Sequence, residues 1–423
     1  AYRISKVVSE DFEGSPYAIP SYQFNLSLGG QRGFQSLVKR AHKAGLTVIV
    51  DFVSNHMAMD SPWIKEEPRL FVRSDTRARN QLTSEFFLHP TGELIAFGRD
   101  PYFPPWNDTA QLDYTNPALR ARMIETLKWI SRYADGVRCD MAMLVLRDYI
   151  RHQWYPLASD SWFNERMPGE FWDEAIRETK KIRPDFKFIA ETYWDKEERL
   201  YELGFDLCYE KKLYDALVAR NAQMVTDRLA RERLALDSSL YFIENHDEPR
   251  AASVFNRTNN LAAAALILSL PGTALIHEGQ MEGKREKLPV QRIKPLLDEP
   301  ADAELREAYS KILGVTSEDV FKDGSFTLFE SNVYGVVAFI RQGAGRTVAY
   351  LGQISEAWHK FNSFPVDVTP LARAIGAQSR FRLTNLLTSS SVTVEENGGA
   401  YRLQLNELAV GGDANFCLLE ARK

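Results

Sequence analysis

Cysteine is scarce in this sequence, which contains only Cys139, Cys208 and Cys417. Their number is odd, they lie far apart, and no two of them form a Cys-x-x-Cys pair. This pattern excludes a disulfide framework and a cysteine-rich zinc site. So few cysteines are typical of proteins in a reducing compartment, and we therefore expect a cytoplasmic protein.

The sequence also lacks a long apolar run and an excess of charge of one sign. The longest apolar run, Leu261–Leu270, is shorter than the about 20 residues that a membrane-spanning helix needs. The 52 Lys and Arg residues are balanced by 57 Asp and Glu residues, and no long basic stretch occurs. We therefore expect neither a membrane nor a nucleic acid as a partner. The oligomeric state is left unknown by the sequence.

What the sequence contains instead is an alternation of helices and short apolar strands. Residues 46–52 are rich in β-branched side chains and apolar on both faces, like the buried strands of a parallel sheet. Apolar residues recur with helical spacing at 34–41, 117–130 and 170–182. Further strands are predicted at 135–140, 186–191, 205–208, 240–244 and 273–277. This alternation predicts an α/β fold with a parallel sheet.

Two segments depart from this alternation. Residues 57–112 have no long helical pattern and many prolines, aspartates and aromatic residues, which indicates an insertion after the first visible strand. From residue 325 onward, short strands alternate with turn residues, as in small all-β domains. We therefore predict four parts, namely 1–56 and 113–324 in the α/β domain, the insertion 57–112, and a C-terminal β-sandwich domain at 325–423.

Acidic residues recur where the predicted strands end. Asp140, Glu191 and Asp247 follow three of these strands, and Asp51 stands near the end of another. A single such aspartate is usually a helix cap or a turn residue. Four acids at four strand ends instead predict one shared site at the carboxyl edge of the sheet, where α/β barrels carry their active sites. Basic residues accompany them at Arg138, His56 and His246.

Paired carboxylates in such a site suit the cleavage of a glycosidic bond. One carboxylate attacks the anomeric carbon, and a protonated one supplies a proton to the leaving oxygen. Arg138 precedes Asp140 by two positions, so both side chains are expected on the same face of a strand. The charge of Arg138 is expected to keep Asp140 ionised, as a nucleophile must be. Cys139 points the other way and is expected to be a small buried residue.

Four segments carry a resemblance to a known family. They are Asp51-Phe-Val-Ser-Asn-His56, Gly136-Val-Arg-Cys-Asp-Met-Ala142, Phe188-Ile-Ala-Glu-Thr-Tyr193 and Glu244-Asn-His-Asp247. In this order they resemble the four signature regions of the α-amylase family of glycoside hydrolases (family 13). The resemblance implies a (β/α)8 TIM barrel with an inserted domain B and a C-terminal all-β domain. Only thirteen residues precede Gly14, so the first two strands of such a barrel are expected to be absent from this chain.

The resemblance also implies a role for each site residue. Asp140 is implied as the nucleophile, Glu191 as the general acid and base, and Asp247 as the third acid, which stabilises the transition state. The residues expected to bind the sugar are Tyr17, Asp51, His56, Arg138 and His246. Trp106, in the aromatic segment 100–106 of the insertion, is a candidate stacking residue. The alternative is that the aromatic side chains of the insertion form its own small core.

The calcium site of many family members is altered in this sequence. The family usually has Lys and His where this chain has Met143 and Leu144, and an acid where it has Gln111. Asn55 is present, but it lacks these partners. Calcium prefers about six to eight oxygen ligands, several of them charged. We therefore expect no metal and no cofactor, and a more apolar surface on the acceptor side of the site.

The function implied by the resemblance is the retaining hydrolysis of α-1,4-glucans (starch or glycogen) or maltooligosaccharides through a covalent glycosyl-enzyme. An α-glucanosyltransferase, in which a sugar replaces water as the acceptor, is the alternative. A non-catalytic relative that only binds glucans is a third reading, which the presence of all three acids disfavours. Endo or exo action, bond type and chain-length preference are not indicated by the sequence.

Overall fold

The computed structural model describes residues 14–74, 84–231, 233–292, 298–356, 361, 363–408 and 415–423. These residues divide into two compact units. The N-terminal unit contains the described residues up to 209, together with 290–292, and the C-terminal unit contains the others.

The N-terminal unit is built around a parallel sheet. Its strands pair in the order β1-β7-β8-β9. Their bounds are β1 Ile49–Val53, β7 Gly136–Asp140, β8 Lys187–Ala190 and β9 Leu207–Tyr209. Every residue of β7 is buried. Because Asp51 lies opposite Arg138 and Val53 opposite Asp140, the carboxyl ends of β1 and β7 share one edge of the sheet.

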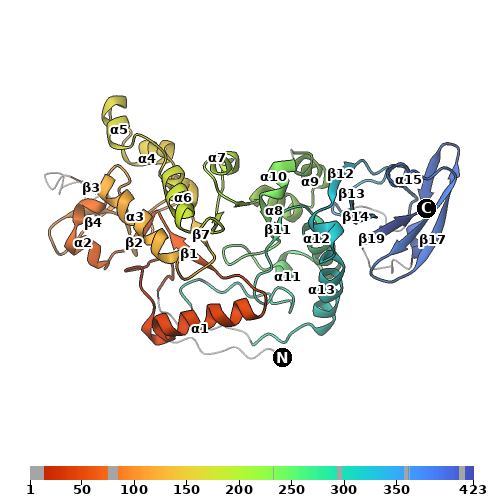
Figure 1. Ribbon diagram of the computed structural model, residues 1–423, viewed down its shortest axis with the longest axis horizontal. Coiled ribbons are helices and arrows are strands. Elements are labelled where there is room, and N and C mark those ends of the chain that lie inside the picture. The colour runs from red at the N-terminus through yellow and green to blue at the C-terminus, as the bar shows by residue number, and fades with distance from the viewer. Residues whose placement is uncertain are drawn as a thin grey trace. The chain divides into compact units, whose positions relative to one another are not determined.

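Helices connect the strands of this unit. They are α1 Gly30–Lys43, α3 Pro117–Ile130, α4 Arg147–Trp154, α5 Asp160–Arg166, α6 Phe171–Ile182 and α7 Glu197–Glu202, with 3-10 helices at Leu26–Leu28 and Ala142–Val145. α3 begins as predicted after Asn116, whose side chain accepts a hydrogen bond from the N–H of Ala118 (2.9 Å). α3 and α6 lie side by side (Figure 1). Their apolar residues share one core with the buried residues of β7 and β8.

The insertion after β1 consists of short elements. β2 His56–Ala58 pairs antiparallel with β6 Thr109–Gln111, so the two ends of the insertion are joined. Its other elements are α2 Pro62–Glu66, a 3-10 helix Pro68–Leu70, and a sheet of β3 Arg73–Ser74, β5 Leu94–Ala96 and β4 Phe86–Leu88. Trp63, Phe71 and Phe87 are buried in the same core as β7. These aromatic residues therefore stabilise the insertion, in agreement with the alternative drawn from the sequence.

The C-terminal unit opens with the remaining α/β elements. β10 Ser239–Tyr241 and β11 Thr273–Ala274 are parallel. The helices are α8 Lys211–Val218, α9 Ala222–Leu229, α10 Arg233–Asp237, α11 Ala251–Val254, α12 Arg257–Ser269, α13 Ala303–Thr316 and α14 Asp319–Lys322. With both units counted, the described residues contain six strands of the parallel pattern. This is the number that the sequence predicts.

An antiparallel sheet of eight strands forms the rest of the C-terminal unit. Its strand order is β12-β13-β14-β19-β16-β17-β18-β15. The bounds are β12 Ser325–Phe329, β13 Val336–Gly343, β14 Arg346–Gln353, β15 Val366–Asp367, β16 Arg380–Asn385, β17 Ser391–Asn397, β18 Ala400–Leu403 and β19 Phe416–Arg422, with α15 at Thr369–Ile375 and a 3-10 helix at Leu405–Leu408. All eight strands are joined edge to edge in one series.

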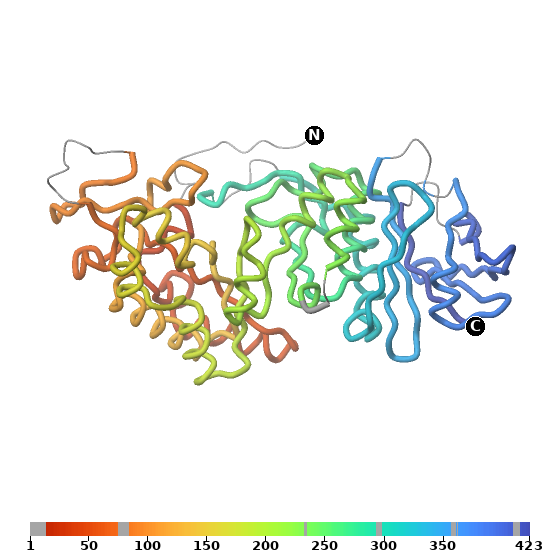
Figure 2. Tube along the Cα trace, turned by 90° about the horizontal axis from the view of Figure 1, so that it is seen from above, coloured from red at the N-terminus to blue at the C-terminus, as the bar shows by residue number. Residues whose placement is uncertain are grey.

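The antiparallel sheet packs directly on the helices of its unit. Figure 2 shows the long hairpin of β13 and β14 in light blue. The hydroxyl of Tyr350 in β14 donates to the carbonyl of Ala262 (2.9 Å), and Arg341 in β13 donates to the carbonyl of Ser269 (3.0 Å). Both acceptors belong to α12, which is rich in buried alanine and therefore allows close packing.

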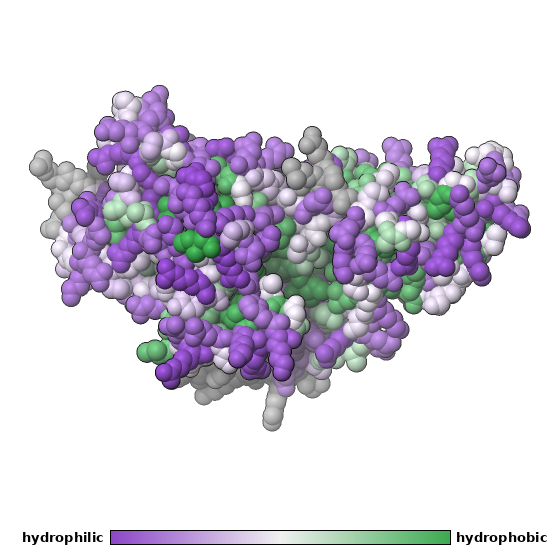
Figure 3. Space-filling model, viewed as in Figure 1, coloured by the Kyte–Doolittle hydropathy of each residue, from purple (hydrophilic) through white to green (hydrophobic). Residues whose placement is uncertain are grey.

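The surface of the protein is largely hydrophilic on the face that can be seen in Figure 3. Within the described ranges, no helix has the length and apolar character needed to cross a membrane. All three cysteines are buried, and Cys139 lies in the core as predicted.

Candidate active site

The candidate site is organised around the side chain of Arg138, in the middle of β7. Its Nη1 lies 3.0 Å from Oδ1 of Asp140 and 2.9 Å from Oδ1 of Asp51. Its Nη2 lies 2.8 Å from Oε2 of Glu191. The alternation of side chains along β7 places Arg138 and Asp140 on one face, as predicted. Pairing with the neighbouring strands brings in the other two acids, so one guanidinium binds three carboxylates.

Burial sets the protonation of this cluster. Arg138, Asp140 and Glu191 are exposed by only 7%, 7% and 2%. Burial and the negative charge of Glu191 raise the pKa of Asp140 well above its usual range, although Arg138 opposes this shift. The charge of Arg138 thus acts in the direction expected from the sequence, but burial and the second carboxylate oppose it.

Arg138 itself stays charged in this surrounding. Burial alone lowers its pKa, but the nearby Glu191, Tyr209, Asp140 and Asp51 together raise it above the ordinary value. Asp51 lies inside β1 and is half exposed, so it extends the cluster toward solvent.

Both oxygens of Glu191 accept hydrogen bonds. The backbone N–H of Met141 donates to Oε2 (2.8 Å), and the hydroxyl of Tyr193 donates to Oε1 (2.9 Å). Met141 has a φ of 42°, in the left-handed region, which costs about 1–2 kcal/mol in a residue other than glycine. This turn at the end of β7 directs its N–H to Glu191. Tyr193 was not predicted as a site residue, although it follows Glu191 by only two positions in the sequence.

Two tyrosine rings lie beside the Arg138 guanidinium. Its Cζ is 5.4 Å from the ring centre of Tyr17 and 5.7 Å from that of Tyr209. Tyr17 was predicted for the site, whereas Tyr209, at the end of β9, was not. Burial raises the pKa of Tyr209 to about 12 and that of Tyr17 further, so both hydroxyls keep their protons. The structure thus brings Tyr17 together with the predicted arginine.

His56 lies at the base of the insertion, with Trp106 against it. The ring centres are 5.0 Å apart. Burial lowers the pKa of His56 to about 4, although a hydrogen bond to the backbone of Tyr17 partly offsets this, so its imidazole is neutral near pH 7. Gly98 makes room for the ring, because a Cβ there would lie 2.9 Å from the Cβ of His56 and 2.6 Å from Oγ1 of Thr109.

Asp247 and His246 belong to the C-terminal unit, in the loop after β10. The Nε2 of His246 lies 3.0 Å from Oδ2 of Asp247, whose side chain is 45% exposed. The side chain of Asn245 accepts a hydrogen bond from the N–H of Asp247 (2.9 Å). This local turn holds the acid at the surface of its unit.

Glu244, which opens the same motif, has a different role. It is fully buried, and its Oε1 accepts a hydrogen bond from Arg250 (2.7 Å) and lies 3.0 Å from Nδ1 of His277. Its Oε2 accepts from the N–H of Ala251 (2.6 Å). Glu244 therefore anchors the loop on both sides of Asp247.

The side chains of Asn55 and Gln111, at the family's calcium position, bind each other. The Nε2 of Gln111 donates to Oδ1 and to the carbonyl of Asn55 (3.0 and 2.9 Å) and to the carbonyl of Leu112 (3.2 Å). The Nδ2 of Asn55 donates in return to Oε1 of Gln111 (3.2 Å). The neutral amide nitrogen of Gln111 thus lies within hydrogen-bond distance of three oxygens at this position. In the part of the chain that the structure describes, no three His, Cys, Asp or Glu side chains are grouped to hold a metal.

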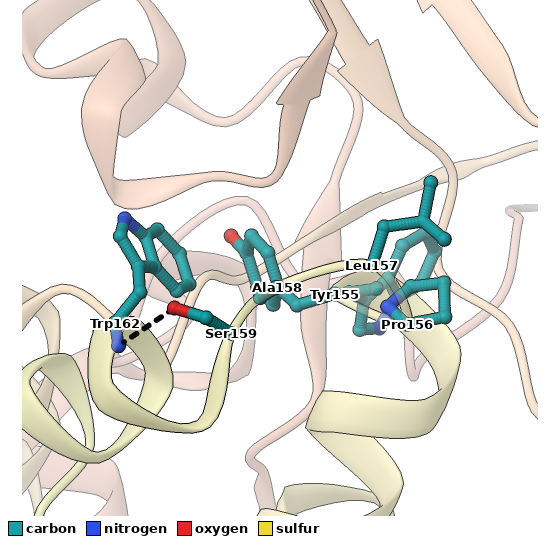
Figure 4. A pocket seen from close by; sticks show the side chains of 7 residues that line it. Tyr155, Pro156, Leu157, Ala158, Ser159 and Trp162 are labelled. Carbon is teal, nitrogen blue, oxygen red and sulfur yellow. Dashed lines mark hydrogen bonds between the residues drawn. The ribbon is translucent and has the colours of Figure 1, made fainter.

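Met143 and Leu144 lie just after β7, in place of the Lys and His of the family. Both are buried in the 3-10 helix Ala142–Val145, and Met143 belongs to the core that includes β7. A separate pocket of about 430 Å³ lies between α4 and α5. Figure 4 shows its lining, which includes Tyr155, Leu157 and Trp162 and no acidic residue.

With this geometry in place, comparison with known proteins decides the family. The family model described as "Alpha amylase, catalytic domain" matches residues 15–319. The chain belongs to the α-amylase family. Among curated proteins it is similar to Alpha-amylase 3 of Dictyoglomus thermophilum, with 23% identity over 296 residues, covering 64% of this chain and 54% of that protein. It is also similar to the 4-alpha-glucanotransferase of Thermotoga maritima, with 25% identity over 283 residues, covering 62% of this chain and 59% of that protein.

The chain spans about half the length of the curated relatives it matches. Among solved structures, a noncanonic maltogenic alpha-amylase from Thermotoga neapolitana superimposes with a TM-score of 0.71 at 21% identity, covering 99% of this chain and 89% of that one. The predicted fold class is thereby confirmed as a TIM barrel with a C-terminal all-β domain.

Proposed function

We propose that this α-amylase family member is a retaining glycosidase that cleaves α-1,4-glucans or maltooligosaccharides. The observation that carries the proposal is the pair of ion contacts by which Arg138 holds Asp140 and Glu191. Retaining glycosidases need carboxyl groups only about 5–5.5 Å apart, because one of them attacks the anomeric carbon directly. The contacts of both carboxylates with neighbouring nitrogens of one guanidinium support such a close spacing.

The proposed reaction has two steps. The Asp140 carboxylate attacks the anomeric carbon, the bond to the leaving oxygen breaks, and Glu191 gives its proton to that oxygen. In the second step water attacks the anomeric carbon, its proton passes to Glu191, and the bond to Asp140 breaks. The reactive form in this mechanism carries a proton on Glu191, with Asp140 ionised against Arg138. A bell-shaped dependence of rate on pH is expected, because gain or loss of a proton destroys this form.

The remaining site residues are proposed to bind the sugar. Tyr17 offers an aromatic face beside Arg138, and His56 is neutral and suited to hydrogen bonds with sugar hydroxyls. Asp247 and His246 are proposed as sugar ligands on the resemblance of their motif. We propose that the chain needs no calcium, since the Gln111 amide binds the oxygens at that position. A cytoplasmic location is supported by the small number of cysteines, all of them buried.

An α-glucanosyltransferase is the second candidate. The same two acids catalyse both reactions, and a sugar hydroxyl then replaces water in the second step. Similarity to a protein named 4-alpha-glucanotransferase and a cluster of aromatic rings next to Glu191 favour it. A non-catalytic glucan-binding protein is disfavoured, because such a protein has no use for a buried, arginine-bound pair of acids.

The test is incubation with maltoheptaose, with the products followed by chromatography. Shorter products matched by new reducing ends indicate a hydrolase, and products both longer and shorter than the substrate indicate a transferase. Asp140→Asn is expected to lower kcat by at least about 10³-fold and Glu191→Gln by about 10²–10⁴-fold, while glucan binding survives. Asp173→Asn, at an exposed position of α6, is the matched control. Full activity of either active-site variant would contradict the mechanism.

A further inference from the structure

The loop that carries Asp247 is closed on itself by hydrogen bonds. It begins at Glu244, shortly after β10, and ends at Ala251, the first residue of α11. Oε1 of Glu244 accepts a hydrogen bond from Nη1 of Arg250 (2.7 Å), and Oε2 accepts from the N–H of Ala251 (2.6 Å). Inside the loop, the side chain of Asn245 accepts from the N–H of Asp247 (2.9 Å). The two ends of the loop are therefore fixed to each other, with Asp247 between them.

A second set of contacts joins this loop to the neighbouring strand. The Nδ1 of His277, which follows β11, lies 3.0 Å from Oε1 of Glu244 and also contacts Nη1 of Arg250. The N–H of His277 donates to the side chain of Gln280 (3.2 Å), whose Nε2 donates to the hydroxyl of Tyr309 in α13 (3.1 Å). Because β10 and β11 pair directly, these contacts connect the loops after both strands to a helix of the same unit.

The guanidinium of Arg250 is closely surrounded. Arg250 is 7% exposed, and Glu244 is not exposed at all. Gly279, in the loop after β11, has a φ of 82°, and a Cβ at this position would lie 2.5 Å from Nη2 of Arg250. The chain approaches the guanidinium this closely because the residue is glycine. Arg250 therefore has no room to move toward the loop after β11.

Stability alone does not explain a buried ion pair at this place. Removing two charges from water is costly, and replacing such a pair with apolar residues of similar size is often neutral or stabilising. Ile243 and Ala251, on either side of the loop, already belong to the apolar core of this unit. Apolar side chains would therefore suit positions 244 and 250. What the charged pair supplies is one defined arrangement of the loop, because its hydrogen bonds are directional.

We propose that Arg250, held by Glu244 and His277, is a positioning residue that places the Asp247 carboxylate against the reacting sugar. The inference rests on the proposed function, in which Asp247 stabilises the transition state. The side chain of Asp247 is 45% exposed, so its neighbours constrain it only partly and the backbone of the loop must supply the rest. Arg250 acts through this loop and does not itself contact the sugar. A displacement of about 1 Å at a reacting group can cost about 10²-fold in rate.

The test is a double-mutant cycle on the hydrolysis of maltoheptaose. Arg250→Met is expected to lower kcat by about 10–100-fold and to change KM by less than about threefold, because Asp247 acts mainly in the transition state. In a chain that already carries Asp247→Asn, the same substitution should lower the residual kcat by less than about threefold. No carboxylate is then left to be placed. A residue that only supports the fold would cause the same loss in both backgrounds.

A second variant separates positioning from misfolding. Arg250→Met leaves the buried Glu244 carboxylate without its counter-charge, which destabilises a protein. Combining it with Glu244→Gln removes both charges and keeps an oxygen that can accept from the N–H of Ala251. This paired variant should unfold near the Tm of the parent chain, measured by calorimetry, and should still lose at least about tenfold in kcat. If Arg250→Met does not fold, the paired variant takes its place in the cycle.

The chain contains a matched control at the opposite edge of the sheet. Asp135, just before β7, binds Nη2 of Arg183 (2.5 Å) and Nε2 of His42 (2.8 Å), so the same three residue types meet there. Arg183→Met should lower the Tm but keep kcat within about twofold, because that edge lies away from the acids. Full kcat in Arg250→Met or in the paired variant, or equal losses with and without the Asp247 carboxylate, would overturn the inference. A parent chain that does not turn over maltoheptaose would overturn the proposed function itself.

Discussion

His56 shows how burial of one residue links the site to stability. Its pKa is about 4 in the folded protein and about 6.5 in an unfolded chain. Since the pKa falls on folding, His56 contributes stability that is complete above about pH 6.5 and is lost as the pH falls toward 4. A shift of this size corresponds to about 3 kcal/mol. We predict that His56→Asn makes the free energy of unfolding less dependent on pH in this interval.

Urea unfolding at several pH values between 4 and 7 measures this effect. His152→Asn, at an exposed position of α4, is the control and should lose stability in acid like the parent chain. An identical acid loss in the parent chain and in His56→Asn would contradict the prediction.

Single residues differ in how far the sequence predicts them. The contact of Arg138 with Asp140 follows from strand alternation alone, and the structure has it. The protonation of Asp140 could not be predicted, because it depends on burial and on Glu191 from another strand. No sequence pattern indicates the left-handed backbone of Trp194 either. Tryptophan rarely adopts this conformation, and only the surroundings of the residue enforce it.

At the scale of helices and strands, local sequence patterns were sufficient to predict elements of the α/β part. The β-branched run became β1, and Asn116 with Pro117 opened α3. The pairing of β2 with β6 was not predicted, because it joins residues far apart in the sequence. That pairing closes the insertion and places His56 opposite Gln111, so it shapes one side of the site.

Gly98 tests whether the insertion positions His56. A Cβ at residue 98 would come within 2.9 Å of the Cβ of His56, and Thr109 blocks the other direction. We predict that Gly98→Ala displaces the histidine, destabilises the protein by about 1–3 kcal/mol and lowers kcat/KM on maltoheptaose. Steady-state kinetics and urea unfolding measure the two effects. Gly169→Ala has open space around the new methyl group and should change neither, whereas full activity of Gly98→Ala would show that His56 is not held this way.

At the scale of the whole molecule, the domain bounds predicted from the sequence differ from the two compact units of the structure. The alternation of helices and strands predicts one continuous segment at 113–324, without a linker. The structure instead separates the units after residue 209, inside that segment. Compactness depends on contacts between distant residues, such as those of Arg341 and Tyr350 with α12. Such long-range contacts cannot be predicted from local sequence patterns. The change to short strands after residue 325 is visible in the local pattern and was predicted.

The stability of the whole molecule should not depend on calcium. An ion bound only by the folded state stabilises it by about 2.7 kcal/mol when its concentration is 100 times the Kd, so removing that ion lowers the Tm. Here the Gln111 amide donates to oxygens of Asn55 and Leu112 at the family's calcium position. We predict equal Tm values in excess EDTA and in excess calcium chloride, measured by calorimetry.

A variant at residue 111 distinguishes stabilisation by the Gln111 amide from stabilisation by a weakly bound calcium ion. Gln111→Ala leaves buried oxygens without their donor, so it should destabilise the protein by about 1–3 kcal/mol, and equally in EDTA and in calcium. If calcium were bound beside the amide, the Tm of the parent chain would fall in EDTA. If the alanine variant instead regained its stability when calcium was added, the oxygens would still form a cation site, and the amide would be only a substitute for the ion. Equal losses of stability in EDTA and in calcium would mean that the hydrogen bonds of Gln111, and not an ion, stabilise this part of the insertion.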